Sequence, residues 1–229
     1  MDPSSAKARL RDLMAANDRV PIPLDLSCLL LCALAGRDID VAVEMDALDT
    51  LASRVEAPGF EGVIDALFAG PTALRGNQAE YYDLANSMLS DVRRTGRGIP
   101  ISLSVLAMEV ARRRGVTVLG IGMPGHFLVG DGGSQFADPF RGAGTFGPDD
   151  ARQLFDRVTG GKVAWSEIYL RPVPNLDILF RVVNNIKVSC SRSFAERHHL
   201  PWVLEVLSWF PQGARFDQSA AARIMAPFN

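Results

Sequence analysis

The sequence has little cysteine, histidine and lysine, with three residues of each type among its 229. Cys28 and Cys32 stand four residues apart in an apolar segment, where we expect small core residues. No further ligand lies near them in the sequence, so we predict no metal site there and no cofactor for the chain. The scarcity of cysteine also removes a disulfide framework and fits a reducing compartment such as the cytoplasm.

Long hydrophobic runs are missing too. The most apolar stretch, LDLSCLLLCALA at 24–35, contains Asp25 and is much shorter than the ~20 residues of a membrane span. The first residues, MDPSSAKARLRDL, lack the apolar segment of an export signal. A formal charge of -2 and a pI of about 5.9 give no electrostatic basis for binding nucleic acid or an anionic membrane. We therefore expect a soluble, cytoplasmic protein with neither of these partners.

What the chain does contain is the composition of a folded protein, with 48% apolar and 22% charged residues. The patterns predict an α+β protein: a helical region at 1–75, a mixed core at 76–170 and a helical tail at 171–229, in one compact unit. Helical spacing is found at 5–17, 24–35, 40–55, 60–69, 148–158, 175–190 and 201–210. Alternating or β-branched runs broken by glycine predict antiparallel strands at 116–123, 126–130 and 134–140, after a mixed stretch at 76–98.

The best-defined helix is expected at 103–114. Apolar and small residues recur along one face of this segment, and Gly115 is a natural residue to follow its end. Ser102 is a good N-cap residue, and in that role it would stabilise the helix by ~1 kcal/mol without any chemistry.

His126 and Asp138 flank a glycine-rich turn between two of the expected strands. A three-residue loop, 131–133 with Gly133 in the left-handed conformation, would place the two side chains directly opposite each other, ~5 Å apart at Cβ. A two-residue Asp-Gly turn would shift the pairing by one residue and put them on opposite faces. Turn chemistry leaves the two registers nearly even. We favour the first, because the second removes the only carboxylate near His126.

A histidine held by a carboxylate keeps one tautomer and presents its other nitrogen as a base. Ser102 and Ser104, at the start of the expected helix, are the candidate nucleophiles, since backbone N–H groups there can bind an oxyanion. A serine needs the base to remove its proton during attack, so capping alone remains the simpler interpretation of Ser102. Cys190 is a weaker candidate. For His198 and His199 we expect a loop or capping role and not metal binding.

One segment resembles a known family. The stretch YYDLANSMLSDVRRTGRGIPISLSVLAMEVARRRGVTVLGIGMPGHFLVGDGGSQFADPF contains N-S-x-L, G-I-P-I-S-L, P-G-H-F-L and D-P-F in the order found in the SirB-type branch of the transglutaminase-like superfamily. The resemblance is close over about 76–140 and looser on either side. It extends into the C-terminal segment, which has room for about one helix pair.

The resemblance implies a papain-like α+β core, in which a helix carrying the nucleophile packs on a small antiparallel sheet. It also implies a Cys-His-Asp triad that attacks amides. His126 and Asp138 match the second and third members, and Ser102 falls at or next to the cysteine position, with Ser104 as the alternative. Three hypotheses follow: an amide hydrolase, peptidase or acyl transferase acting on a protein or peptide; an inactive module that binds a protein; and a purely structural role for these residues.

Overall fold

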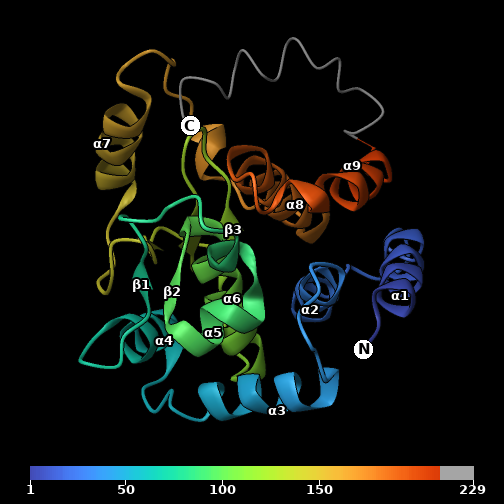
Figure 1. The fold of residues 1–229 in the computed structure, drawn as a ribbon. Coiled ribbons are helices and arrows are strands. Elements are labelled where there is room, and N and C mark those ends of the chain that lie inside the picture. Colours follow the sequence, from blue (N-terminus) through green and yellow to red (C-terminus); the bar gives the residue numbers. More distant parts are fainter. Residues whose placement is uncertain (212–229) are drawn as a thin grey trace.

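Helices form most of the protein in the computed structural model, which describes residues 1–211 (Figure 1). The α-helices are α1 (Pro3–Ala15), α2 (Leu24–Leu34), α3 (Val41–Ala52), α4 (Gly59–Phe68), α5 (Leu89–Thr95), α6 (Pro100–Arg113), α7 (Pro148–Thr159), α8 (Asn175–Arg192) and α9 (Leu200–Ser208). The strands are β1 (Arg75–Gly76), β2 (Arg97–Gly98), β3 (Leu119–Ile121), β4 (Leu128–Gly130) and β5 (Phe136–Ala137), and three short 3-10 helices are η1 (Leu84–Ser87), η2 (Glu167–Leu170) and η3 (Arg197–His199).

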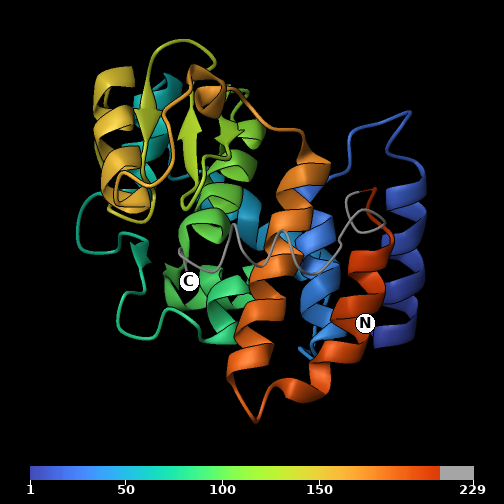
Figure 2. The same ribbon diagram turned by 90° about the horizontal axis from the view of Figure 1, so that it is seen from above.

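This is the α+β architecture that the sequence predicts, with every expected helix and strand present near its expected place. In Figure 2, α1, α2, α8 and α9 lie side by side at one end of the molecule, while the sheet and α7 lie at the other. No described helix is both long enough and apolar enough to cross a bilayer. The last part of the expected helical tail, 212–229, lies outside the described residues.

The stretch at 24–35 can be apolar throughout because the helix that it forms, α2, is buried on nearly all sides. Helix α2 contacts α1, α3, α5, α6 and α8, so there is no solvent-facing stripe for polar residues to occupy. One apolar cluster extends from Ala6 in α1 to Phe210 after α9, with residues of α6 in between. Residues from all three regions expected from the sequence contribute to this cluster.

The three-stranded sheet has the order β3-β4-β5, and both of its pairings are antiparallel. Successive residues of a strand face opposite sides, and here both sides are covered. Val129 and Ala137 belong to the main core, where α6 lies. Leu128 and Phe136 belong to a second cluster with α7. A sheet that is buried on both faces explains why these strands are continuously apolar in sequence.

The hairpin register differs from both expected alternatives. Val129 pairs with Ala137 and Gly130 with Phe136, so the connecting loop has five residues, 131–135. Asp131 is the cause: its carboxylate accepts the N–H groups of Gly133 (2.7 Å) and Gln135 (3.1 Å), and this closes a wider loop. The left-handed glycine of this loop is Gly132, at φ +85°, and not Gly133.

The stretch at 76–98 begins and ends in a parallel pair, β1 (Arg75–Gly76) with β2 (Arg97–Gly98), that the sequence pattern does not predict. Gly76 of β1 lies against Phe140, because a Cβ at this position would be 2.4 Å from the Phe140 ring and 2.5 Å from its carbonyl oxygen. The pair therefore fixes the segment before α6 next to the segment after β5.

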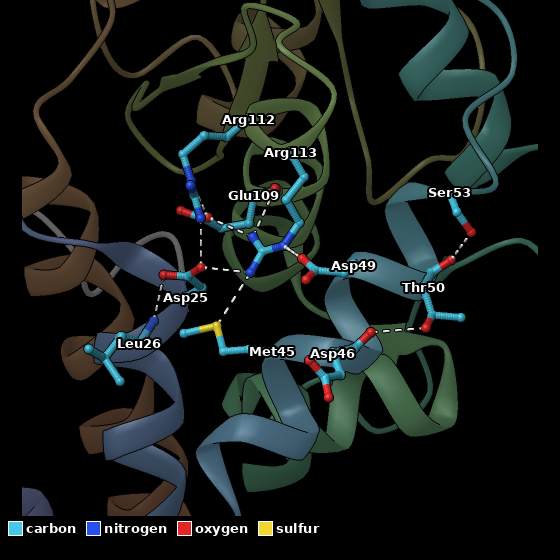
Figure 3. A network of polar contacts seen from close by, with 10 residues as sticks. All are labelled: Asp25, Leu26, Met45, Asp46, Asp49, Thr50, Ser53, Glu109, Arg112 and Arg113. Atoms are coloured by element: carbon cyan, nitrogen blue, oxygen red, sulfur yellow. Dashed lines mark hydrogen bonds and ion pairs between the residues drawn. The ribbon is translucent and has the colours of Figure 1, made fainter.

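Ion pairs around the buried carboxylates of Asp25 and Glu109 tie helix α6 to α2, and a further ion pair ties it to α3 (Figure 3). The Asp25 carboxylate accepts from Arg112 (2.8 Å) and Arg113 (2.9 Å), which also bind Glu109. Arg113 reaches Asp49 of α3 over 2.6 Å. Burial opposes ionisation of Asp25, but the N–H of Leu26 and the two guanidinium groups hold its pKa below the ordinary value; burial raises the pKa of Glu109. This network fixes the direction of the helix that carries Ser102.

Candidate functional site

The structure brings His126 and Asp138 together. Nε2 of His126 lies 2.8 Å from Oδ2 of Asp138. His126 follows the Pro124-Gly125 turn and precedes β4, while Asp138 directly follows β5. Their contact survives the change in register because the pairing is shifted by two residues, which leaves every side chain on its original face. The two residues are therefore diagonal neighbours and not directly opposed.

Asp138 is almost completely buried, and its carboxylate has three neighbours. Oδ2 faces His126 and, at 3.6 Å, Nε of Arg141; Oδ1 accepts the N–H of Phe140 over 3.1 Å. A carboxylate accepts hydrogen bonds, so the neutral imidazole donates its Nε2–H to Asp138. Nδ1 of His126 then carries a lone pair, and it has no hydrogen-bond partner among the described residues. In this tautomer Nδ1 is the nitrogen that can accept a proton.

Ser102 is not the N-cap of α6. The helix begins three residues earlier than expected, with Ile99 at the N-cap and Pro100 in the first helical position. Proline suits this position because its fixed φ is helical and it has no N–H to leave unpaired. Ser102 is the third helical residue, and its Oγ accepts the N–H of Ile99 over 3.1 Å. That contact is one half of a capping box.

The Ser102 hydroxyl is already hydrogen-bonded. It lies 2.6 Å from the carbonyl oxygen of Asn86 and 3.1 Å from that of Ile99. Within residues 1–211 no hydrogen bond joins it to His126. The start of α6 does present backbone donors. The N–H groups of Ile101 and Ser102 lie in the first turn, where no helical carbonyl precedes them to accept a hydrogen bond. A nucleophile there would have oxyanion donors beside it.

Asn86 organises the loop before α6. Its side-chain amide donates to the carbonyls of Glu80 (2.6 Å) and Tyr81 (3.2 Å), and its amide oxygen accepts from Asn77 (3.1 Å). These contacts pair both the NH2 group and the oxygen of the buried Asn86 side chain. The Ser102 hydroxyl bonds to the backbone carbonyl of the same residue. The paired asparagines 77 and 86 are a structural feature next to the candidate site that sequence reasoning missed, and only the N-S-x-L motif pointed toward it.

Ser104, the alternative nucleophile, is completely buried, and its hydroxyl has no hydrogen-bond partner in the described part of the chain. Cys190 is buried, and burial raises the pKa of its thiol to about 11, which disfavours a thiolate. Burial also raises the pKa of both Cys28 and Cys32. These thiols are unsuited to nucleophilic chemistry.

The other two histidines lie at the turn between α8 and α9. Nδ1 of His199 accepts from the indole of Trp202 over 3.2 Å, and its Nε2 lies 3.3 Å from Glu196. His198 contacts the carbonyl of Ala195 over 2.7 Å. No group of three or more potential ligands that could hold a metal ion is found within residues 1–211.

Aromatic rings adjoin the His126–Asp138 pair. The Phe140 ring lies edge-on to His126, with centroids 6.4 Å apart, and Tyr81 is edge-on to Phe140 at 5.8 Å. Two surface cavities, of about 520 and 650 Å³, lie elsewhere: one between α3, α4 and the α5–β2 turn, the other beside the α3–α4 connection. Neither is lined by Ser102, His126 or Asp138.

A helix packed on an antiparallel sheet, with histidine and aspartate paired beside the sheet, is the architecture expected of a transglutaminase-like core. The sequence profile of the transglutaminase-like superfamily matches residues 41–184, more than half of the chain. The chain belongs to this superfamily.

Bacterial relatives share much of the sequence. The chain is 35% identical over 191 residues to a UPF0162 protein of Xylella fastidiosa, an alignment that covers 76% of this chain and 66% of the relative. A UPF0162 protein of Pseudomonas aeruginosa is 32% identical over 137 residues, 59% of this chain and 50% of that protein. The chain thus spans just under two thirds of the length of the Xylella protein.

Similarity also reaches a eukaryotic protein. Human F-box only protein 21 is 28% identical over 123 residues, which cover 52% of this chain and 19% of the relative. No solved structure matches the chain.

Proposed function

We propose that the chain is an amide-directed hydrolase or acyl transferase in which His126 and Asp138 act as the base for Ser102. The observation that carries this proposal is the 2.8 Å contact between Nε2 of His126 and Oδ2 of Asp138, which leaves Nδ1 as the basic nitrogen. Membership of the transglutaminase-like superfamily supports amide chemistry. We place the chain in the SirB-type branch, where serine stands near the usual cysteine position.

In the proposed reaction, the Ser102 hydroxyl gives up its hydrogen bond to Asn86 and turns to Nδ1 of His126. Oγ attacks the amide carbonyl while its proton passes to Nδ1. The N–H groups at the start of α6 receive the oxyanion. Collapse of the tetrahedral intermediate breaks the C–N bond, and Nδ1 returns the proton to the leaving amine. Water or a second amine then attacks the acyl ester, with His126 as base again.

A second candidate function has an observation in its favour. The Ser102 hydroxyl bonds to Asn86 and Ile99, so it already serves as a structural link between the loop and α6. If that is its only role, the domain is an inactive transglutaminase-like module that binds a protein partner. Ser104 remains the alternative nucleophile for the active form, although its complete burial makes attack harder.

Labelling with a fluorophosphonate distinguishes these functions, because the reagent forms an adduct only with an activated serine. The pure protein is treated with the reagent and the adduct is mapped by mass spectrometry. The active form predicts an adduct at Ser102 that disappears in His126→Ala. Ser191→Ala, at an exposed serine of α8, is the matched control and should label normally. An absent adduct in a folded wild-type protein favours the binding module.

A further inference from the structure

The turn between α8 and α9 carries the most exposed large apolar side chain of the described residues. Phe194 is 89% exposed. Burying a phenylalanine side chain is favourable by roughly 1.5–3 kcal/mol. The exposed side chain of Phe194 does not contribute this free energy to the folding of the isolated chain. Arg192, Arg197 and His198 surround it in sequence and are exposed as well. We call these four residues the basic turn.

The basic turn is positively charged in a chain whose formal charge is -2. Arg192 and Arg197 form no ion pair with a carboxylate among residues 1–211. The acidic residue of the turn, Glu196, lies against the ring of His199. Two guanidinium groups that have no carboxylate partner within residues 1–211, beside an exposed phenylalanine, are suited to a partner that is both acidic and apolar.

A row of rings leads from the basic turn to His126. The Arg192 guanidinium stacks over Tyr82 at 4.0 Å from the ring centroid, a close cation–π contact. Tyr82 lies 5.2 Å from Tyr81, which meets Phe140, and Phe140 meets His126. We call Tyr82, Tyr81, Phe140 and His126 the ring row. All four rings are partly exposed, and Figure 2 shows α8 ending beside the segment that carries the tyrosines.

We propose that the basic turn and the ring row form one docking surface for an acidic peptide segment of another protein. Acidic side chains of the segment pair with Arg192 and Arg197, and an apolar side chain packs against Phe194 and the adjoining rings. If the acidic segment is the substrate on which His126 acts, the substrate class is an acidic protein or peptide; this assignment rests on the proposed function.

Fluorescence anisotropy tests the surface with the full chain and three fluorescein-labelled 12-residue peptides. The first has a Leu-Phe pair next to four glutamates; the second replaces the glutamates with lysines, and the third replaces Leu-Phe with serines. We expect the first peptide to bind at low salt, to weaken as salt is added, and to bind at least about tenfold more tightly than the others.

Substitutions in the docking surface test whether the peptide binds there. Phe194→Ala and Arg197→Glu should each weaken the first peptide about tenfold. Val43→Ala on α3 and Arg152→Glu on α7 are matched truncation and charge-reversal controls at exposed positions, and they should change nothing. No binding, equal binding of the lysine peptide, or equal losses in the controls would overturn the proposal. A dimer in sedimentation that Phe194→Ala dissociates would also overturn it, since the surface would then belong to a second copy.

The docking surface and the proposed function fail in different ways. Ser102→Ala removes the proposed nucleophile but leaves the surface intact, so the peptide should bind this variant as tightly as the wild type. Peptide binding without fluorophosphonate labelling retains the surface and rejects the enzyme. Fluorophosphonate labelling without peptide binding retains the enzyme and rejects the docking surface.

Discussion

The hydroxyl of Ser102 donates to the carbonyl oxygen of Asn86 over 2.6 Å and so joins the loop before α6 to the first turn of the helix. The Ser102 Oγ also accepts the N–H of Ile99. We expect Ser102→Ala to lower the free energy of unfolding by about 1–2 kcal/mol, because it leaves buried backbone groups unpaired. Urea unfolding measures this loss. Ser191→Ala, which removes an exposed serine hydroxyl, should cost less than about 0.5 kcal/mol. Equal small losses would show that the Asn86 bond stabilises nothing.

The proton of the His126 ring is expected on Nε2. At a pH where the imidazole is neutral, two-dimensional ¹H–¹⁵N spectra of the ring distinguish the tautomers. The 2.8 Å contact with Asp138 predicts the Nε2–H form. In Asp138→Asn the new amide can donate to Nε2, so the proton should move to Nδ1. A wild-type ring that carries its proton on Nδ1 would leave no base to face Ser102.

The buried Asp25 carboxylate should stabilise the fold at neutral pH. Asp25→Asn breaks its pairs with Arg112 and Arg113, and we expect a loss of about 3 kcal/mol at pH 7. The pKa of Asp25 is lowered in the folded state, so the wild type retains this stability above the unfolded value and loses it as pH falls through the folded pKa. The gap between wild type and variant should therefore narrow below about pH 4.

The exposed neighbour Asp46 supplies the control for that prediction. Asp46→Asn lies on α3, in the same region as the network, and should change stability by less than about 0.5 kcal/mol at either pH (Figure 3). A gap for Asp25→Asn that stays constant between pH 7 and pH 3 would mean that its charge is not the cause.

Close packing of β1 against the segment after β5 predicts a large effect at Gly76. A methyl group there would meet the Phe140 ring and carbonyl at 2.4–2.5 Å, and the backbone atom cannot move aside cheaply. We expect Gly76→Ala to destabilise the protein by roughly 2 kcal/mol or more in thermal unfolding. Gly147→Ala is the matched control, since nothing lies within 4 Å of its Cβ position. Equal melting temperatures for the two variants would refute the contact.

Local patterns predicted the helices well, and they failed where a side chain bonds to distant or unusual backbone. Ser102 is a favourable N-cap residue, yet Pro100 fits the first helical position and moves the cap back to Ile99. The hairpin loop is longer than expected because Asp131 bonds two N–H groups across it. The contact of His126 with Asp138 survived that error, since a shift of two residues preserves the face of each side chain.

The ion pairs of α6 show a different limit of prediction from local sequence. Arg112 and Arg113 occupy the last turn of α6, where arginine favourably offsets the helix dipole. The same two residues bind Asp25, more than 80 positions away in sequence. Pairing over such a separation depends on how α2 packs against α6, and no local spacing contains that information. The same holds for Asn86, whose partners include Ser102 and Asn77.

The central claim is that the side chain at position 102 can reach Nδ1 of His126. Ser102→Cys tests it through the pH dependence of iodoacetamide alkylation, followed by mass spectrometry. An imidazole in reach and the start of α6 both stabilise a thiolate, so half-maximal reactivity should fall well below pH ~8.5. The His126→Ala double variant should return it to that value or above. Ser104→Cys is the positional control, and Cys190, with its pKa of about 11, should stay unreactive in the folded protein. A thiol at position 102 that titrates at or above pH ~8.5 with and without His126 would contradict the account.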